Sequence, residues 1–217
     1  MINLLQYAGK ETITLELSGN TLIKGSIIDL SRDIVVLFNG IDFLYIPVEH
    51  IQHVTKASNE NEAVVEPSEL PSINKNELTL PGILTQALGF YTELYVMRNE
   101  SLHGYITHVL QDYFVFHSPI YKTMYIASKH LKSLIPYPHN QLPYGLHRDN
   151  AAPSDLEPTL AAQLAKMTNE LVILNQSTKP YHIGKIMKMD GPFIEMQSAR
   201  MANTYVNLEH VKIVRRV

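Results

Sequence analysis

Short stretches of alternating hydrophobic and polar residues follow one another along most of this 217-residue chain. Residues 12–17 alternate at every position, which is the period of a half-buried β-strand. Residues 34–38 form a β-branched run that is too short for an ordinary helix. Five such runs follow one another three times. They predict strands over 12–17, 22–30, 34–38, 43–47 and 51–55, over 93–97, 102–110, 113–117, 122–127 and 131–135, and over 171–174, 182–189, 192–197, 203–207 and 211–214.

A seven-residue signature marks the same threefold repetition. It reads Tyr, a β-branched or similar aliphatic residue, three variable residues, His and an aliphatic residue, and its tyrosines return every 80 residues. A fixed internal period indicates a structural unit that is built more than once. A glycine within each predicted second strand keeps the same register and indicates a bend or a close backbone approach. The residues concerned are Tyr45, Tyr125 and Tyr205, His50, His130 and His210, and Gly25, Gly104 and Gly184.

The chain is predicted to be all-β with short helices at the start of each repeat. Residues 80–88 and 159–167 carry apolar residues on one helical face, and residues 4–8 are compatible with a helix. A short helix and five strands, the second long and bent, form the ground plan of a small Sm-like or SH3-like barrel. We therefore expect three tandem barrels at residues 1–56, 80–136 and 159–217, with an acidic linker at 57–79 and a proline-rich linker at 137–158.

Composition narrows the function classes. The chain has no cysteine, which excludes disulfides and thiolate metal sites and favours folding in a reducing compartment. No apolar run reaches the roughly 18 residues that span a membrane, and the N-terminus lacks the pattern of a signal peptide. We expect cytoplasmic synthesis and no membrane partner.

The repeated helix, the bent glycine strand and the Tyr-to-His signature together resemble the repeats of the spore coat protein B family of spore-forming bacilli. They are also similar to the short Sm-like domains called DUF2642. The resemblance implies a structural protein of sporulation, located in the spore coat, that acts through self-association or through binding other coat-type proteins. It implies no cofactor.

A second resemblance concerns the segment Ser128-Lys129-His130-Leu131. It is similar to the Lys-His segment of the bacterial Sm-like RNA chaperone Hfq, in which these residues line a uridine pocket. This resemblance implies Lys129 and His130 as RNA-binding residues and makes an Sm-like RNA-binding protein the alternative function. In the other two repeats the residue before the histidine is Glu49 or Glu209, whose charge repels phosphate.

For the signature histidines and tyrosines, the sequence leaves two interpretations. They are structural residues of a turn and a strand, or they bind metal or stack on bases. The other histidines show no metal-ligand spacing, and no nucleophile elbow, phosphate loop or dinucleotide fingerprint is present. We therefore expect no enzyme activity, no metal and no cofactor.

Positive charge gathers in the last repeat, where residues 159–217 hold eight Lys and Arg against four Asp and Glu. A solvated face is one interpretation, and an anion-binding surface is the other. The candidate anion-binding residues are Lys179, Lys185, Lys188, Arg200, Lys212, Arg215 and Arg216.

Open strand edges seek partners, and Sm-like barrels associate by pairing the fourth strand of one with the fifth strand of the next. Three barrels in one chain can do this internally, as a pseudo-trimer or an arc, or between chains. The sequence leaves these arrangements open.

Overall fold

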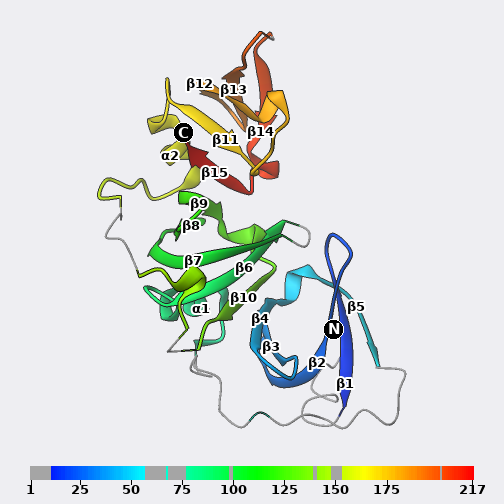
Figure 1. The fold of residues 1–217 in the computed structure, drawn as a ribbon. Helices are drawn as coiled ribbons and strands as arrows, with labels where there is room; N and C mark the ends of the chain where they lie inside the picture. The colour runs from blue at the N-terminus through cyan, green and yellow to red at the C-terminus, as the bar shows by residue number, and fades with distance from the viewer. Residues whose placement is uncertain are drawn as a thin grey trace. The chain divides into compact units, whose positions relative to one another are not determined.

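The computed structural model describes residues 11–56, 67, 77–97, 100–138, 141–147, 153–200 and 202–217 (Figure 1). Its strands are linked side by side in one antiparallel order, β14-β13-β12-β11-β15-β9-β8-β7-β6-β10-β4-β3-β2-β1-β5. Repeat 1 consists of β1 (Thr12–Leu17), β2 (Thr21–Leu30), β3 (Ile34–Phe38), β4 (Phe43–Pro47) and β5 (Ile51–Lys56). Repeat 2 consists of β6 (Tyr91–Met97), β7 (Glu100–Val109), β8 (Tyr113–Ser118), β9 (Lys122–Ala127) and β10 (Ser133–Pro136). Repeat 3 consists of β11 (Leu171–Leu174), β12 (Ile183–Asp190), β13 (Phe193–Gln197), β14 (Thr204–Asn207) and β15 (Ile213–Arg216).

Every repeat has the same strand order, which is fifth, first, second, third, fourth. In repeat 1, for example, β1 pairs with β2 on one side and with β5 on the other. In repeat 3, β11 pairs in the same way with β12 and β15. The predicted β-rich fold with a repeated architecture is therefore present, and most strand limits lie within two residues of the prediction.

The glycine in each second strand sits where another backbone passes close by. A Cβ at Gly25 would overlap the carbonyl oxygen of Phe38, and one at Gly104 would overlap that of His117. At Gly184 an added Cβ would lie 2.6 Å from the oxygen of Gln197. A bulge interrupts the register shortly after each glycine, at 27/29, 106/108 and 186/188. Extra residues of this kind bend and twist a strand, which explains how a long second strand can curve.

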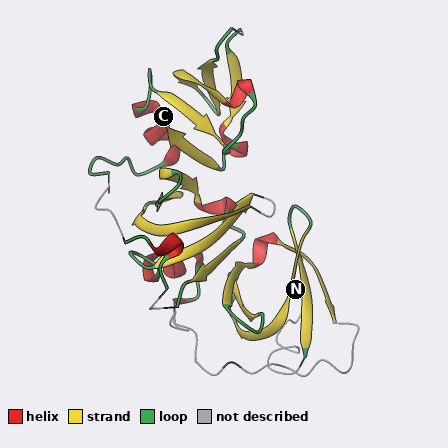
Figure 2. Cartoon of the chain, viewed as in Figure 1, coloured by secondary structure: helices red, strands yellow, loops and turns green. Residues whose placement is uncertain are grey.

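Two helices precede repeats 2 and 3 (Figure 2), α1 (Leu80–Gln86) and α2 (Leu160–Lys166). The side chains of Thr79 and Thr159 cap them by accepting from the amides of Gly82 and Ala162. Each helix is too short to be stable by itself, so its apolar face must be held by packing. The helix expected at residues 4–8 lies outside the described residues.

A 3₁₀ turn connects the fourth and fifth strands in each repeat: η2 (Val48–His50), η4 (Ser128–His130) and η7 (Leu208–His210). In repeats 2 and 3 the fifth strand begins two residues later than predicted, because the residues after the turn are buried outside the ladder. In the hairpin between β3 and β4, Gly40 has φ 98°, and the side chain of Asn39 accepts from the amides of Ile41 and Asp42.

The chain divides into two compact units, and the division passes through repeat 2. Unit 1 is Met1–His103 with Leu131–Gly145, and unit 2 is Gly104–His130 with Leu146–Val217. The core of unit 1 includes Ile13, Leu15, Leu37, Ile46 and Ile135. The core of unit 2 combines residues of β8 and β9 with residues of α2 and repeat 3.

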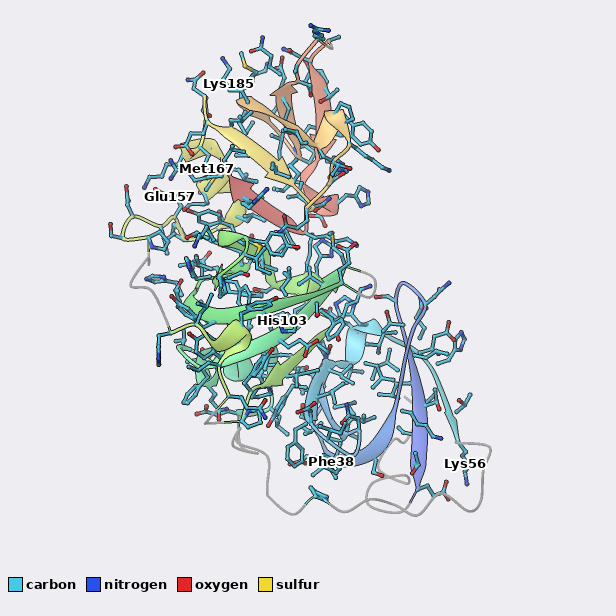
Figure 3. The ribbon with its side chains drawn as sticks, in the orientation of Figure 1. Phe38, Lys56, His103, Glu157, Met167 and Lys185 are labelled. Carbon is cyan, nitrogen blue, oxygen red and sulfur yellow. The ribbon has the colours of Figure 1, made fainter. Side chains whose placement is uncertain are left out.

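The two predicted linkers are described only in part. Residues 57–66 and 68–76 of the first lie outside the described residues, as do 139–140 and 148–152 of the second. In the described part of the second, the hydroxyl of Tyr137 lies 2.7 Å from Nδ1 of His103, which is labelled in Figure 3, and Pro143 is buried. Leu156 packs against the core of unit 2. These parts of the proline-rich segment are therefore packed against the folded units.

Candidate functional site: the strand edges that join the repeats

Consecutive repeats are joined by pairing a fourth strand with a fifth strand. The first junction pairs β4 of repeat 1 with β10 of repeat 2, within unit 1. The second junction pairs β9 of repeat 2 with β15 of repeat 3, within unit 2. Tyr45 lies opposite Leu134 in the first, and Tyr125 lies opposite Val214 in the second. Leu134 and Val214 are 80 residues apart, so both junctions use the same register.

The exposure of the signature tyrosine depends on whether its strand is paired on its outer edge. Tyr45 is 0% exposed and Tyr125 is 3% exposed, and both belong to strands that take part in a junction. Tyr205 lies in β14, which is at one end of the strand order, and it is 58% exposed. Tyr45 and Tyr125 therefore lie in the junctions, and Tyr205 holds the equivalent strand position on an exposed edge. The structural interpretation of the three tyrosines stays a prediction.

The second junction has a continuous hydrophobic core. Leu160, Leu164 and Met167 of the α2 segment pack against Tyr113 and Tyr125 of repeat 2 (Figure 3). All five side chains are buried. The helix that precedes repeat 3 thus covers the outer face of the third and fourth strands of repeat 2.

Polar contacts fix the second junction at its margins. The hydroxyl of Tyr113 donates to the carbonyl oxygen of Glu157 at 2.6 Å and lies 3.2 Å from Gln163 Oε1. Burial raises the pKa of Tyr113 to about 12, because the phenolate would lose its hydration. The amide of Leu160 donates to Asp112 Oδ1 at 2.8 Å. These bonds hold the start of α2 against the turn between β7 and β8 of repeat 2.

The first junction is built on the same plan but with different contacts. Ile83 and Leu84 of α1 are buried, and Ser31 Oγ donates to the carbonyl oxygen of Leu78 at 2.5 Å. Burial raises the pKa of the Asp42 carboxyl, and the nearby negative charge of Glu93 raises it further. Two carboxyl groups are therefore close together in unit 1.

A cavity of about 390 Å³ lies in unit 1 between repeat 1 and the start of β10. Lys24 and Lys132 line it together with Tyr95 and Ser133. Lys132 is a buried cation whose side chain lies beside Gly19, and its backbone amide donates to the carbonyl oxygen of Tyr95. Lys132 could not be singled out from the sequence, because it stands in the segment 131–135, which was expected to be an ordinary strand.

The three signature histidines lie in the 3₁₀ turns and make different contacts. His50 Nδ1 is 3.2 Å from Ser18 Oγ, within repeat 1. His130 Nε2 is 3.1 Å from the carbonyl oxygen of Glu209, across the second junction. The carbonyl oxygen of His210 accepts from Asn175 Nδ2 at 3.0 Å. The structure brings His130 to the neighbouring repeat and does not gather the three rings into one place within either unit.

Lys129, the other residue of the proposed RNA-binding pair, forms an ion pair with Glu209. This contact with Lys129 lowers the pKa of the Glu209 carboxyl. Both Lys129 and His130 thus contact Glu209 in unit 2. The pair that resembles an RNA-binding segment lies at the second junction.

The candidate anion-binding residues of repeat 3 are spread over several elements. Lys185 and Lys188 lie on β12, Arg215 and Arg216 lie on β15, and the others lie in turns and loops. Lys188 Nζ is 3.5 Å from Glu195 Oε2, and Arg216 donates to Glu170 at 2.7 Å. Lys179 lies over the ring of Tyr181. Two of the seven cations therefore have carboxylate partners, and Arg200 and Lys212 stand apart from both pairs.

No group of three or more His, Asp and Glu side chains suited to a metal ion occurs among the described residues. Within the same residues, no helix is long and apolar enough to cross a membrane.

The surface that the sequence did not reveal is the outer face of the third and fourth strands. Tyr113 of repeat 2 corresponds to Phe193 of repeat 3, 80 residues later. Tyr113 is 0% exposed in the second junction, and Phe193 is 41% exposed. An available signal was the position of each predicted helix directly before a repeat, since its apolar face needed a partner.

Fold and site together define a β-rich repeat protein. Its repeats are joined through strand edges and covered by short helices. The family described as YwrJ third domain matches residues 159–214. The chain is 32% identical over 209 residues to a protein described as "Uncharacterized protein YwrJ" from Bacillus subtilis (strain 168). The alignment covers 92% of this chain and 93% of that protein. The chain belongs to the YwrJ family. Its relationship to the spore coat protein B and DUF2642 families stays a prediction.

Proposed function

We propose that this chain is a non-enzymatic structural protein that assembles with other proteins, and that its three repeats are Sm-like barrels. One observation carries the proposal: the two junctions join successive repeats by the same pairing of fourth and fifth strands, in the same register. A repeated surface that recognises another copy of its own unit is an assembly device.

Three features support the Sm-like assignment. The strand order is the same in each repeat, a bulge bends each second strand, and a 3₁₀ turn connects each fourth strand to its fifth. A bulged and strongly curved five-stranded sheet is the usual basis of a small barrel.

The contacts favour protein assembly over RNA binding. Lys129 and His130 contact Glu209, so an RNA ligand would have to displace a carboxylate and a carbonyl oxygen. Outside repeat 3 the chain has a net charge of −7, obtained from −3 for the whole chain and +4 for residues 159–217. Negative charge opposes phosphate binding.

The spore coat is the proposed setting. It follows from the resemblance of the repeats to a coat protein family, and the relative identified above is a Bacillus protein. Self-association and binding to other coat-type proteins are the corresponding partner classes. Synthesis would take place in the cytoplasm.

Salt dependence separates assembly from RNA binding. Light scattering of the purified chain should show self-association that persists or strengthens as salt rises, because burial of apolar surface is not screened. Fluorescence anisotropy with a labelled uridine oligomer should show weak or no binding at physiological salt, because RNA affinity falls steeply with salt.

Three alanine variants test whether any RNA binding depends on Lys129 and His130. Lys129→Ala and His130→Ala should leave the anisotropy unchanged, as should Lys185→Ala in repeat 3. Sub-micromolar RNA binding that is lost in Lys129→Ala and His130→Ala but kept in Lys185→Ala would overturn the proposed function and establish the RNA-binding alternative.

A further inference from the structure

Among the described residues, the two strands at the ends of the strand order have a partner on one side only. β14 pairs with β13, and β5 pairs with β1. β14 is a fourth strand and β5 is a fifth strand, so they are the two types of edge that make both junctions inside the chain. Open edges of this kind are templates for further strand pairing.

The three fifth strands differ in burial, and β5 exposes positions that are buried in β10 and β15. In β10 Ser133, Leu134 and Ile135 are buried, and in β15 Ile213 and Val214 are buried. In β5 no residue is buried, and four of its six residues are exposed. Val54 corresponds to Leu134 and Val214, which are both 0% exposed.

The fourth strands show the same contrast. β4 and β9, which take part in junctions, each contain four consecutive buried residues. β14 contains none. Tyr205 is exposed where Tyr45 and Tyr125 are buried, and Phe193 of the adjacent strand is exposed where Tyr113 is buried. Repeat 3 therefore presents two large aromatic side chains on a face that is covered in the other repeats.

We propose that β14 of one copy pairs with β5 of a second copy, in the register of the two internal junctions, with Tyr205 opposite Val54. This inference rests on the proposed function and names its partner, a second copy of this chain. In that register the amide of Asn207 meets the carbonyl oxygen of Gln52, as the amide of Ala127 meets that of Lys212 at 3.0 Å in the second junction. Two different surfaces are joined, so the contact is heterologous and repeats from copy to copy.

The 3₁₀ turns place charged side chains at this contact. In the second junction Lys129 of η4 pairs with Glu209 of η7. The corresponding residues between copies are Glu209 and Glu49, which have like charges. Their repulsion weakens the association at low salt and diminishes as salt rises. Glu49→Lys makes this pair opposite in charge, as in the second junction but with the two signs exchanged.

Cysteine trapping tests the register directly, because the chain has no cysteine. Residues directly opposite in an antiparallel pair have Cα atoms about 4.5–5.5 Å apart, within the reach of a disulfide. A mixture of full-length Tyr205→Cys and full-length Val54→Cys, one of them carrying a mass tag, should give the mixed disulfide under mild oxidation. A mixture of Tyr205→Cys with Ile41→Cys, whose position is exposed but off both edges, should not.

The trapping experiment can contradict the proposal in two ways. Equal disulfide yields in the two mixtures would mean that the register is not selected. If the double variant Tyr205→Cys/Val54→Cys formed its disulfide within one chain and remained monomeric, β14 and β5 would close on each other, and the proposal of pairing between copies would be wrong.

Sedimentation of the full chain over a concentration series gives the second test. Tyr205→Glu should weaken self-association by about tenfold or more, equivalent to about 1.4 kcal/mol. Tyr181→Glu, a substitution of another exposed tyrosine of repeat 3, should have no effect. Glu49→Lys should strengthen association by a few-fold, as expected for an exposed ion pair.

The outcomes distinguish this inference from the proposed function. Self-association that Tyr205→Glu leaves unchanged would overturn the β14–β5 contact, while assembly through another surface would stand. A chain that remains monomeric at every concentration and salt would overturn both the contact and self-association.

Discussion

The two junctions have the same register but are held by different contacts. The second has three residue pairs along β9 and β15, a shared core with α2, and an ion pair between Lys129 and Glu209. The first has the pair Tyr45 and Leu134, a cavity nearby, and Asp42 and Glu93 close together. Register is therefore a property of the repeated unit, whereas the contacts at each junction depend on local substitutions.

One backbone position explains much of the difference. The amide of Ala127 donates to the carbonyl oxygen of Lys212 at the second junction. The corresponding residue at the first junction is Pro47, 80 residues earlier, and proline has no N–H to donate. Pro136 ends β10 at the position that Arg216 occupies in β15. Prolines at both ends of the first ladder limit its length.

The largest expected effect is the weakening of both junctions by a single substitution. Gly104→Val should destabilise repeat 2 by roughly 2–4 kcal/mol, because a side chain there would overlap the carbonyl oxygen of His117. Repeat 2 supplies β9 to one junction and β10 to the other, so both should weaken. Denaturant unfolding measures the loss, with Thr107→Val in the same strand as a control. A Gly104→Val protein as stable as the parent would contradict the close approach seen at this position.

A smaller effect is expected when the second junction is given the proline that stands in the first. Ala127→Pro removes one hydrogen bond and leaves the carbonyl oxygen of Lys212, a half-buried residue, without that donor, which should cost about 1–3 kcal/mol. The backbone can accept proline, because Pro47 has φ −60° at the corresponding position. Hydrogen exchange of repeat 3 amides should quicken.

A second proline substitution elsewhere in repeat 2, such as Leu110→Pro, cannot serve as the control. The amide of Leu110 also donates a hydrogen bond, to the carbonyl oxygen of Tyr113. Ala127→Gly, which keeps the N–H, is the matched variant. If Ala127→Gly quickened exchange as much as Ala127→Pro, loss of the side chain and not of the hydrogen bond would be responsible.

The smallest effect depends on pH. Tyr113→Phe should cost about 0.5–1.5 kcal/mol at neutral pH, because it removes the bond to Glu157. The pKa of Tyr113 is raised to about 12 in the folded chain, so its protonated form stabilises the fold fully below its unfolded pKa of about 10. This contribution is lost as pH rises through the folded pKa. The stabilities of parent and variant should therefore converge between these values.

Denaturant unfolding at a series of alkaline pH values provides the measurement. The pKa of Tyr95 in unit 1 is also raised to about 12, so only the difference between parent and variant isolates Tyr113. Ile34 holds the corresponding place in repeat 1 and does not titrate. A stability difference that stays constant across the alkaline range would show that Tyr113 titrates normally.

The strand pattern could be predicted closely because alternation and period are local properties of the sequence. Ile34–Phe38, Phe43–Pro47 and Lys122–Ala127 have the limits that the sequence predicts. The later starts of β10 and β15 could not be foreseen, because Leu131 and Val211 are buried by tertiary packing and not by the ladder.

The site was only partly predictable. The period identified Tyr45, Tyr125 and Tyr205 as equivalent, but equivalence in sequence does not reveal that the third is exposed. That difference arises because β14 stands at one end of the strand order of the described residues, whereas β4 and β9 each pair with a fifth strand. The contact of Lys129 with Glu209 joins residues 80 positions apart, and only the strand register brings them together.

Pro47 has a consequence for the way the molecule can change over evolutionary time. In a ring of identical subunits, one substitution alters every interface at once, so a proline that weakens the ladder would weaken all of them. In a single chain the same change touches one joint, and the covalent connection keeps the neighbouring repeats at high effective concentration. Each junction within one chain can thus change independently of the other, and this chain has proline at one of them where the other has alanine.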